Sequence, residues 1–201
     1  MINRIELCIK VPNSVYVACS GGADSMAAVD FFRRGRKKVT IAHFDHGTEH
    51  GEDARNLVLE WAKVEGIDVV ESRTDESKPP GRSWEDWWRQ KRYEFLHGLP
   101  GPVVTGHNLD DAIEWWIMSS LHGTGRLIPL SRDNVIRPFL TTPKRVLHEW
   151  CDNRDIPYLE DPGNTDPRYT RSVVRHSLMP HALKVNPGLY KTIRKKLRMT
   201  A

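Results

Sequence analysis

The feature that most constrains the fold is a hexapeptide, Ser20-Gly-Gly-Ala-Asp-Ser25, that joins a predicted strand to a predicted helix. The strand, Val15–Cys19, is rich in β-branched and aromatic residues, and the helical pattern runs from Met26 to about Gly35. Two glycines let backbone amides approach an anion, and a helix N-terminus adds partial positive charge. The hexapeptide therefore predicts a phosphate-binding turn. The alternative is a tight strand-to-helix turn that binds nothing.

Strands and helices alternate along most of the chain. Further strands are predicted at 39–43, 67–70 and 102–105, and further helices at about 53–64, 83–97, 109–120 and 143–154. This alternation is typical of a Rossmann-like α/β fold, in which helices cover both faces of a parallel sheet. Ligands of such sheets bind beyond the carboxyl ends of the strands. The loops after Cys19, His43 and Thr105 all lie there.

Composition excludes several classes of protein. No segment approaches the roughly 20 consecutive apolar residues of a membrane span, so no membrane partner is expected. Cys8, Cys19 and Cys151 form no Cys-x-x-Cys pair. This cysteine usage is typical of a reduced, cytoplasmic compartment. The sequence leaves the oligomeric state open.

Basic residues are concentrated near the C-terminus. Between Arg168 and Ala201 there are nine Lys or Arg residues and no Asp or Glu. A helix predicted there carries cations on one face (Lys191, Arg194, Lys195 and Arg198) and apolar side chains on another (Leu189, Ile193 and Leu197). We expect an ATP-binding domain at residues 1–160 and a basic helical extension at 161–201 that packs on it and binds RNA. The alternative is a solvated helix that binds nothing.

Later motifs follow in a fixed order. They are Ala42-His-Phe-Asp-His-Gly47, Trp84-Glu-Asp-Trp-Trp-Arg-Gln-Lys-Arg-Tyr93, Thr105-Gly-His-Asn-Leu-Asp-Asp111 with Glu114, Ile136-Arg-Pro138, and Asp161-Pro-Gly-Asn-Thr-Asp-Pro-Arg-Tyr-Thr-Arg171 with Arg175 and Pro180. The SGGxDS hexapeptide resembles the signature of the PP-loop ATP pyrophosphatases. The whole series, from about Val15 to Pro180, resembles the tRNA(Ile)-lysidine synthase family.

This resemblance implies a two-step reaction that uses ATP and Mg²⁺. ATP adenylates the C2 carbonyl oxygen of the wobble cytidine in tRNA(Ile) with a CAU anticodon, and the side-chain amine of L-lysine then attacks C2. The family's pattern places ATP on Ser20, Gly21, Gly22, Ala23, Asp24, Ser25, Ala42, His43, Phe44, Arg92 and Gly106. It places the substrates on His46, Glu85, Arg89, Asn108, Arg137, Arg171 and Arg175.

Four carboxylates are the catalytic candidates that the resemblance implies: Asp24, Asp110, Asp111 and Glu114. Asp24 and Asp111 are also the candidate Mg²⁺ ligands, because Mg²⁺ prefers carboxylates together with substrate phosphates. Which carboxylate holds the metal and which accepts the lysine proton stays open. The alternative is that the acids after Asn108 only cap a helix.

Two other functions remain in competition. One is a PP-loop thiolase that inserts sulfur into a tRNA base, although the chain lacks the paired cysteines that such chemistry usually needs. The other is a non-catalytic tRNA-binding relative. A tryptophan group on the predicted helix at 83–97 is also ambiguous (Trp84, Trp87 and Trp88). These indoles can stack on unpaired bases or pack against the sheet, and packing is the favoured interpretation.

Overall fold

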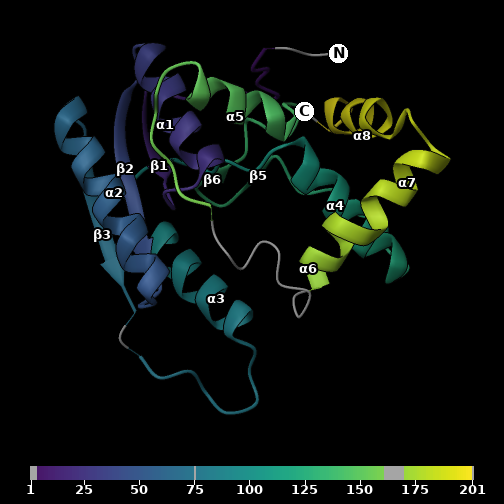
Figure 1. Ribbon diagram of the computed structural model, residues 1–201, viewed down its shortest axis with the longest axis horizontal. Coiled ribbons are helices and arrows are strands. Elements are labelled where there is room, and N and C mark those ends of the chain that lie inside the picture. The colour runs from purple at the N-terminus through teal and green to yellow at the C-terminus, as the bar shows by residue number, and fades with distance from the viewer. Residues whose placement is uncertain (1–3, 75, 161–169, 201) are drawn as a thin grey trace.

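A six-stranded sheet in the order β3-β2-β1-β4-β6-β5 organises the chain. The computed structural model describes residues 4–74, 76–160 and 170–200, without the side chain of Glu49 (Figure 1). The strands are β1 (Ser14–Ala18), β2 (Lys38–Asp45), β3 (Asp68–Arg73), β4 (Val103–Val104), β5 (Ser131–Arg132) and β6 (Val135–Ile136). All neighbouring strands are parallel except β5, which pairs antiparallel with β6 at one edge. The predicted α/β fold with a parallel sheet is confirmed.

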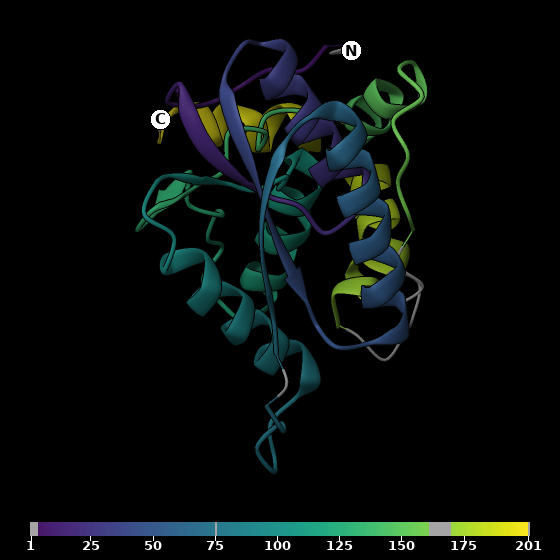
Figure 2. The ribbon, with the colours of Figure 1, turned by 90° about the vertical axis from the view of Figure 1, so that its left-hand side faces the viewer.

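Helices cover both faces of this sheet (Figures 1 and 2). They are α1 (Ala23–Arg34), α2 (Glu49–Glu65), α3 (Trp84–His97), α4 (Leu109–Leu121), α5 (Lys144–Asp152), α6 (Thr170–Val173), α7 (Met179–Val185) and α8 (Leu189–Arg198), with a π-helical turn η2 (Val174–Leu178) between α6 and α7. Side chains of α1, α2 and α5 share one core with β1 and β2. Side chains of α3 form a second core on the opposite face. None of the described helices has the length and apolar character needed to cross a bilayer.

The side chains of β1 alternate between the cores on the two faces of the sheet. Val15 and Val17 are buried with the α1 core, whereas Tyr16 and Ala18 pack on the α3 side. Successive strand residues point to opposite faces, so a central strand buried on both sides needs apolar residues at every position. The short β-branched run after Asn13 meets that requirement.

Two helix starts differ from the prediction, and one hairpin was not predicted. Helix α2 begins at Glu49 rather than near residue 53, because the Thr48 side chain accepts a hydrogen bond from Gly51 N and caps the helix earlier. Pro143 precedes α5 as its N-cap instead of lying in its first turn. The β5–β6 hairpin was not predicted. Its turn contains Asp133, whose φ of 54° lies in the left-handed region that Asp and Asn tolerate best.

The C-terminal helices share a third core with α4. Leu189, Ile193 and Leu197 of α8 are buried against it, as the helical spacing predicts. The boundary expected at residues 160/161 falls beside residues 161–169, which lie outside the described part of the chain. The division into two domains therefore stays a prediction.

The strand order reverses between β1 and β4, which are direct neighbours with Tyr16 opposite Val103. Loops that leave the carboxyl ends of two such strands turn to opposite sides and open a crevice between them. The loop after β1 contains the hexapeptide, and the loop after β4 contains Gly106 and Asn108. The topology thus brings together two motifs that lie more than 80 residues apart in sequence.

Candidate active site

The hexapeptide folds into a turn that is held by the hydroxyl of Ser25. Ser25 Oγ donates to the carbonyl oxygen of Gly22 at 2.9 Å and accepts from Ser20 N at 3.1 Å. Gly22 is the N-cap of α1, and its carbonyl also accepts from Met26 N. Ser25 is therefore buried and occupied within the turn, whereas Ser20 lies at the exposed rim.

Three consecutive backbone amides of this turn have no acceptor within the part of the chain that the structure describes. Among the described residues, no carbonyl or side chain accepts a hydrogen bond from the N–H groups of Gly21, Gly22 or Ala23. The first N–H groups of a helix have no partner within the helix, and together with the helix dipole they form an anion-binding site. The turn thus presents consecutive donors at the point where the sheet opens its crevice.

Two positions of the site require glycine, because atoms of neighbouring segments lie close to where a Cβ would stand. Gly21 has φ of 81°, and a Cβ there would lie 3.2 Å from the Cβ of Ala54 on α2. A Cβ on Gly106 would lie 2.9 Å from the carbonyl oxygen of Asp24. The loop after β4 therefore packs directly on the hexapeptide, and a side chain at Gly106 would force these two loops apart. A side chain at Gly21 would instead force the hexapeptide away from α2.

Asp24 points an unpaired oxygen into this region. Its Oδ1 is buried without a hydrogen-bond partner among the described residues, and so is the Nδ2 of Asn108. Burial, followed by the nearby negative charge of Asp111, raises the pKa of Asp24 to about 7. Lys144 acts in the opposite direction. Asn108 also lowers the pKa of Asp24 as a nearby amide donor, so these two atoms lie near each other. Buried polar atoms normally have partners, and a ligand bound here would contact both.

We expect the Asp24→Asn variant to gain stability relative to wild type as pH rises. The carboxyl has its ordinary pKa of 3.8 in the unfolded chain and about 7 in the folded protein. Between these values the folded state holds the proton more tightly, so the wild-type free energy of unfolding falls with rising pH, by at most about 1.4 kcal/mol per pH unit. Urea unfolding at about pH 5 and about pH 8 measures this. Identical pH slopes in the two proteins would contradict it.

Asp111 and Glu114 are bound by arginines from the C-terminal segment. Arg171 Nε donates to Glu114 Oε2 at 2.8 Å, and its Nη2 donates to Asp111 Oδ1. Arg175 Nε donates to Glu114 Oε1 at 2.6 Å. Glu114 is only 1% exposed. The four side chains form a cluster that ties α4 to α6 and η2, and the negative charges are already paired within it.

Asp110 and Asn108 both stabilise helix ends. Asp110 Oδ2 accepts from Lys144 N at 2.8 Å, at the start of α5, and its Oδ1 accepts from the hydroxyl of Tyr190 at 2.6 Å. Asn108 caps α4, and Asp111 completes the capping box by accepting from Asn108 N. Each oxygen of Asp110 is thus occupied by the protein. This placement favours a structural role for Asp110 over the catalytic role expected from the motif.

Arginines gather around His107 on the other side of the crevice. Burial, and then the charges of Arg171, Arg137, Arg92 and Arg89 in that order, hold the pKa of His107 well below its usual range. Its Nδ1 lies 2.7 Å from Thr105 Oγ1. Among the described residues no carboxylate pairs with Arg89 or Arg92. Arg171 is already paired with Asp111 and Glu114, so it is Arg89 and Arg92 that are suited to a polyanionic ligand.

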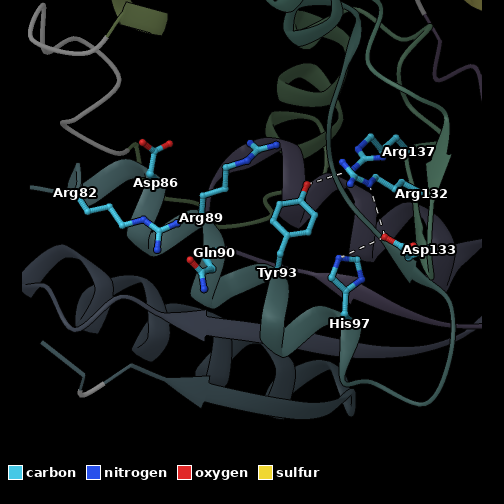
Figure 3. Close-up of a pocket in the computed structure, with 9 residues that line it drawn as sticks. All are labelled: Arg82, Asp86, Arg89, Gln90, Tyr93, His97, Arg132, Asp133 and Arg137. Atoms are coloured by element: carbon cyan, nitrogen blue, oxygen red, sulfur yellow. Dashed lines mark hydrogen bonds and ion pairs between the residues drawn. The ribbon is translucent and has the colours of Figure 1, made fainter. Parts of the chain in front are cut away.

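A basic pocket of about 420 Å³ adjoins this arginine group (Figure 3). Arg89 and Tyr93 of α3 face it from one side and Arg137 from the other, and Arg137 Nη2 donates to Tyr93 Oη at 3.2 Å. Basic residues outnumber acidic ones in its lining, which consists of Arg82, Asp86, Arg89, Gln90, Tyr93, His97, Arg132, Asp133 and Arg137. Arg137 is nearly buried and also donates to the carbonyl oxygen of Pro129, so its position is rigidly held.

The remaining predicted residues divide between core and surface. Ala42 and Phe44 are buried in β2, so only their backbone is placed to meet a ligand. His43 lies within β2 rather than in a loop, and its Nδ1 is 2.9 Å from the carbonyl oxygen of Cys19. His46 lies just beyond β2, against the ring of Trp88. Glu85 is exposed in the first turn of α3.

Three residues at the site were not among the predicted ones. His107 stands at the centre of the arginine group, Tyr93 holds Arg137, and Lys144 lies close enough to Asp24 to lower its pKa. The position of His107 in the loop after β4 was a usable signal. Lys144 gave none, since it lies at the start of a helix far along the chain.

The carboxylates fit Mg²⁺ only in company with a phosphate ligand. The described residues contain no group of three or more His, Cys, Asp or Glu side chains arranged for a metal. Asp24 Oδ1 is open, whereas both oxygens of Asp111 accept protein hydrogen bonds. Mg²⁺ commonly binds one or two carboxylates together with substrate phosphates and water. Asp24 next to the unbonded amides meets that description.

The chain is similar to curated tRNA(Ile)-lysidine synthases. That of Thermotoga sp. (strain RQ2) is 30% identical over an alignment of 203 residues, which covers 92% of this chain and 49% of the relative. That of Salinispora arenicola (strain CNS-205) is 32% identical over 208 residues, with 93% and 62% covered. The chain thus spans about half to three fifths of the length of these relatives.

The fold is also found in a solved structure and in a family model. The U34-tRNA thiolase NcsA from Methanococcus maripaludis has a TM-score of 0.74 at 17% identity, with 92% of this chain and 70% of that chain covered. This likeness shows the shared fold. The family model described as the PP-loop domain matches residues 2–182. With the SGGxDS turn at the strand-order reversal, the chain belongs to the PP-loop ATP pyrophosphatase family.

Proposed function

We propose that this protein is an ATP-dependent ligase of the tRNA(Ile)-lysidine synthase type. The observation that carries the proposal is the set of unbonded amides at Gly21, Gly22 and Ala23, next to the open oxygen of Asp24. These donors suit the pyrophosphate portion of ATP, whose negative charge increases as it departs. Mg²⁺, when bound with ATP, would neutralise phosphate charge beside Asp24.

The proposed reaction has two steps. In the first, the cytosine C2 oxygen attacks the α-phosphorus of ATP, a P–O bond forms, and pyrophosphate leaves. In the second, the neutral lysine amine attacks C2, a C–N bond forms, and AMP departs with the oxygen. Adenylation converts a poor leaving oxygen into a good one. The arginine group around His107 would stabilise the charge on the α-phosphate.

The amine of lysine needs a carboxylate that is not already paired. Asp111 and Glu114 are bound by Arg171 and Arg175. Glu85 has no partner among the described residues and acts electrostatically on Arg171 from the first turn of α3. We assign the lysine ammonium to Glu85 at the rim of the crevice. Glu85→Gln is then expected to raise the KM for lysine.

RNA would meet two basic surfaces. One is the pocket of Figure 3, and the other is the outer face of α8. The latter, the α8 basic surface, consists of Lys191, Lys195 and Lys196, which are exposed. Arg198 is not part of it, because its guanidinium pairs with Glu6. Arg194 is partly buried and is also left out.

Replacing all three lysines of the α8 basic surface by glutamine is expected to weaken RNA binding in a salt-dependent way. For contacts with looped, single-stranded RNA, the slope of log K against log salt should become less steep by about 2. Filter binding over a range of salt concentrations measures it. Substitution is preferred to truncation, because Leu189, Ile193 and Leu197 hold α8 in the core.

A matched control removes three exposed cations that lie on other elements. Arg36 lies just before β2, Lys38 is the first residue of β2, and Lys63 lies in the last turn of α2. Their replacement by glutamine changes the net charge equally. It should leave the slope unchanged, and equal effects from both triple variants would contradict a specific α8 surface.

The thiolase alternative conflicts with the state of the thiols. Burial raises the pKa of Cys19 and Cys8, and burial together with Asp152 raises the pKa of Cys151 to about 12. Thiols held in the protonated form are poor nucleophiles. Alkylation of accessible thiols should therefore leave activity intact.

The decisive experiment incubates the protein with ATP, labelled lysine and tRNA(Ile) that carries a CAU anticodon. Mass spectrometry of the digested tRNA is expected to show a nucleoside that contains lysine. Folded protein that yields no such nucleoside would overturn the proposal. ATP–pyrophosphate exchange then separates a different PP-loop reaction from a relative that binds tRNA without catalysis.

A further inference from the structure

A ladder of aromatic rings runs from the core to the surface beside β2. Phe95 and Phe44 lie 6.0 Å apart between ring centroids, Phe44 and His46 5.1 Å, His46 and Trp88 5.6 Å, and Trp88 and Trp84 5.2 Å. Phe44 is buried, whereas Trp84 at the other end is 50% exposed. Trp84 and Trp88 are inclined by only 32°. The ladder thus ends in an indole with an uncovered surface.

The outer rings line a second pocket, of about 440 Å³. Two of its lining residues carry buried polar atoms that have no hydrogen-bond partner among the described residues, the Nε1 of Trp87 and the Oγ1 of Thr74. Trp87 is only 6% exposed. An indole N–H that is buried usually finds an acceptor. A purely apolar ligand would leave both atoms unsatisfied.

We infer that this pocket holds an unpaired nucleobase of an RNA strand. A base offers a flat π surface for Trp84 and an edge with both donors and acceptors for Trp87 and Thr74. The inference rests on the proposed function, because it takes the strand to be part of the tRNA substrate. It adds a base-binding site away from the unbonded amides of the hexapeptide.

The position of Arg82 favours an RNA strand over a free nucleotide. Its guanidinium lies 5.7 Å from the ring centroid of Trp87, and it also lines the basic pocket of Figure 3. Lys78 Nζ lies 5.4 Å from the ring centroid of Trp84. Cations therefore flank the aromatic pocket and connect it to the basic pocket. A strand can place phosphates along these cations and one base on Trp84.

The test compares Trp84→Ala with Trp84→Phe, and uses Trp115→Ala as the matched control. Trp115 is 42% exposed on α4, so the control removes a similarly exposed indole. The probes are an RNA stem-loop with a CAU loop, a fully paired RNA of equal length, and ATP. Because stacking on an aromatic ring contributes about 1–3 kcal/mol per base, Trp84→Ala should weaken stem-loop binding about 5- to 150-fold. Trp84→Phe should retain most of the wild-type affinity for the stem-loop.

A second variant tests the unpaired donor. Trp87→Phe keeps an aromatic ring in the core but removes Nε1. It should weaken stem-loop binding about 2- to 12-fold, the effect of one neutral hydrogen bond. Paired RNA should bind all variants like wild type, within about twofold. Circular dichroism and thermal melting establish that each variant is folded.

Three results would overturn the inference. They are unchanged stem-loop affinity in folded Trp84→Ala, an equal loss for paired RNA, and a loss of ATP affinity, which would assign the pocket to adenine. A different result would overturn the proposed function and leave this inference standing. Stem-loop binding that depends on Trp84, without any lysine-containing nucleoside, would retain the base site and reject lysidine synthesis.

Discussion

Replacing Gly21 by alanine should lower ATP affinity by at least about 100-fold, the effect of losing two hydrogen bonds to a charged group at about 1.5 kcal/mol each. At φ of 81° an L-residue is strained by about 1–2 kcal/mol. The added Cβ would also lie 3.2 Å from the Cβ of Ala54 and 3.3 Å from its carbonyl oxygen. Backbone atoms of α2 cannot rotate away, so the turn moves and its amides no longer converge. Isothermal titration with ATP and Mg²⁺ measures the loss.

Gly123→Ala separates backbone strain from the loss of the site. Gly123 has φ of 77°, close to that of Gly21, but a Cβ there would meet nothing within 4 Å. It follows α4 and lies outside the hexapeptide. We expect this variant to lose about 1–2 kcal/mol of unfolding free energy and to bind ATP like wild type. Normal ATP binding by Gly21→Ala would refute the phosphate-binding role of the turn.

Glu114→Gln should reduce the free energy of unfolding by about 3 kcal/mol. Glu114 accepts from Arg171 Nε at 2.8 Å, and from Arg175 Nε at 2.6 Å and Nη2 at 3.1 Å. Glutamine keeps the shape but removes the charge, and its amide directs N–H groups toward a guanidinium. Asp111 alone then balances two arginines that are partly buried. Urea unfolding with a constant m-value measures the change.

The control for this variant is Glu94→Gln on α3. Glu94 is an exposed residue, and its carboxylate lies 3.2 Å from Lys91 Nζ. Exposed pairs contribute little, so the loss should stay below about 1 kcal/mol. If Glu114→Gln is as stable as wild type but loses activity, Glu114 serves the substrate instead of anchoring the C-terminal segment.

Elements with strong local patterns were predictable. The strand before Ser20, the hexapeptide and α1 follow from residues close in sequence, because period-two and helical spacings specify them directly. The strand predicted at 102–105 is also observed, as β4. The β5–β6 hairpin was less accessible, because two-residue strands carry almost no periodic signal and form when neighbouring strands supply their partners.

Site residues also differ in whether nearby sequence or distant segments determine their surroundings. Asp111 and Glu114 were expected on one face of a helix, and they lie there. Their pairing with Arg171 and Arg175 joins residues 57 to 61 positions apart and was not predictable from spacing. It changes their chemistry, because a carboxylate already bound by guanidinium groups is not a free base. Residues 161–169, whose sequence contributed to the resemblance, lie outside the described part of the chain.

The amino-acid order was enough to specify the strand-to-helix turn, since its glycines, its unbonded amides and the Ser25 hydroxyl that holds it lie within six consecutive residues. It was also enough to specify the alternation of strands and helices. Burial and charge pairing were settled by packing between distant segments, which made Trp87 a core residue and left Trp84 exposed. The physical reason is range: backbone geometry depends on near neighbours, whereas solvation and electrostatic pairing depend on every segment that folds against a residue.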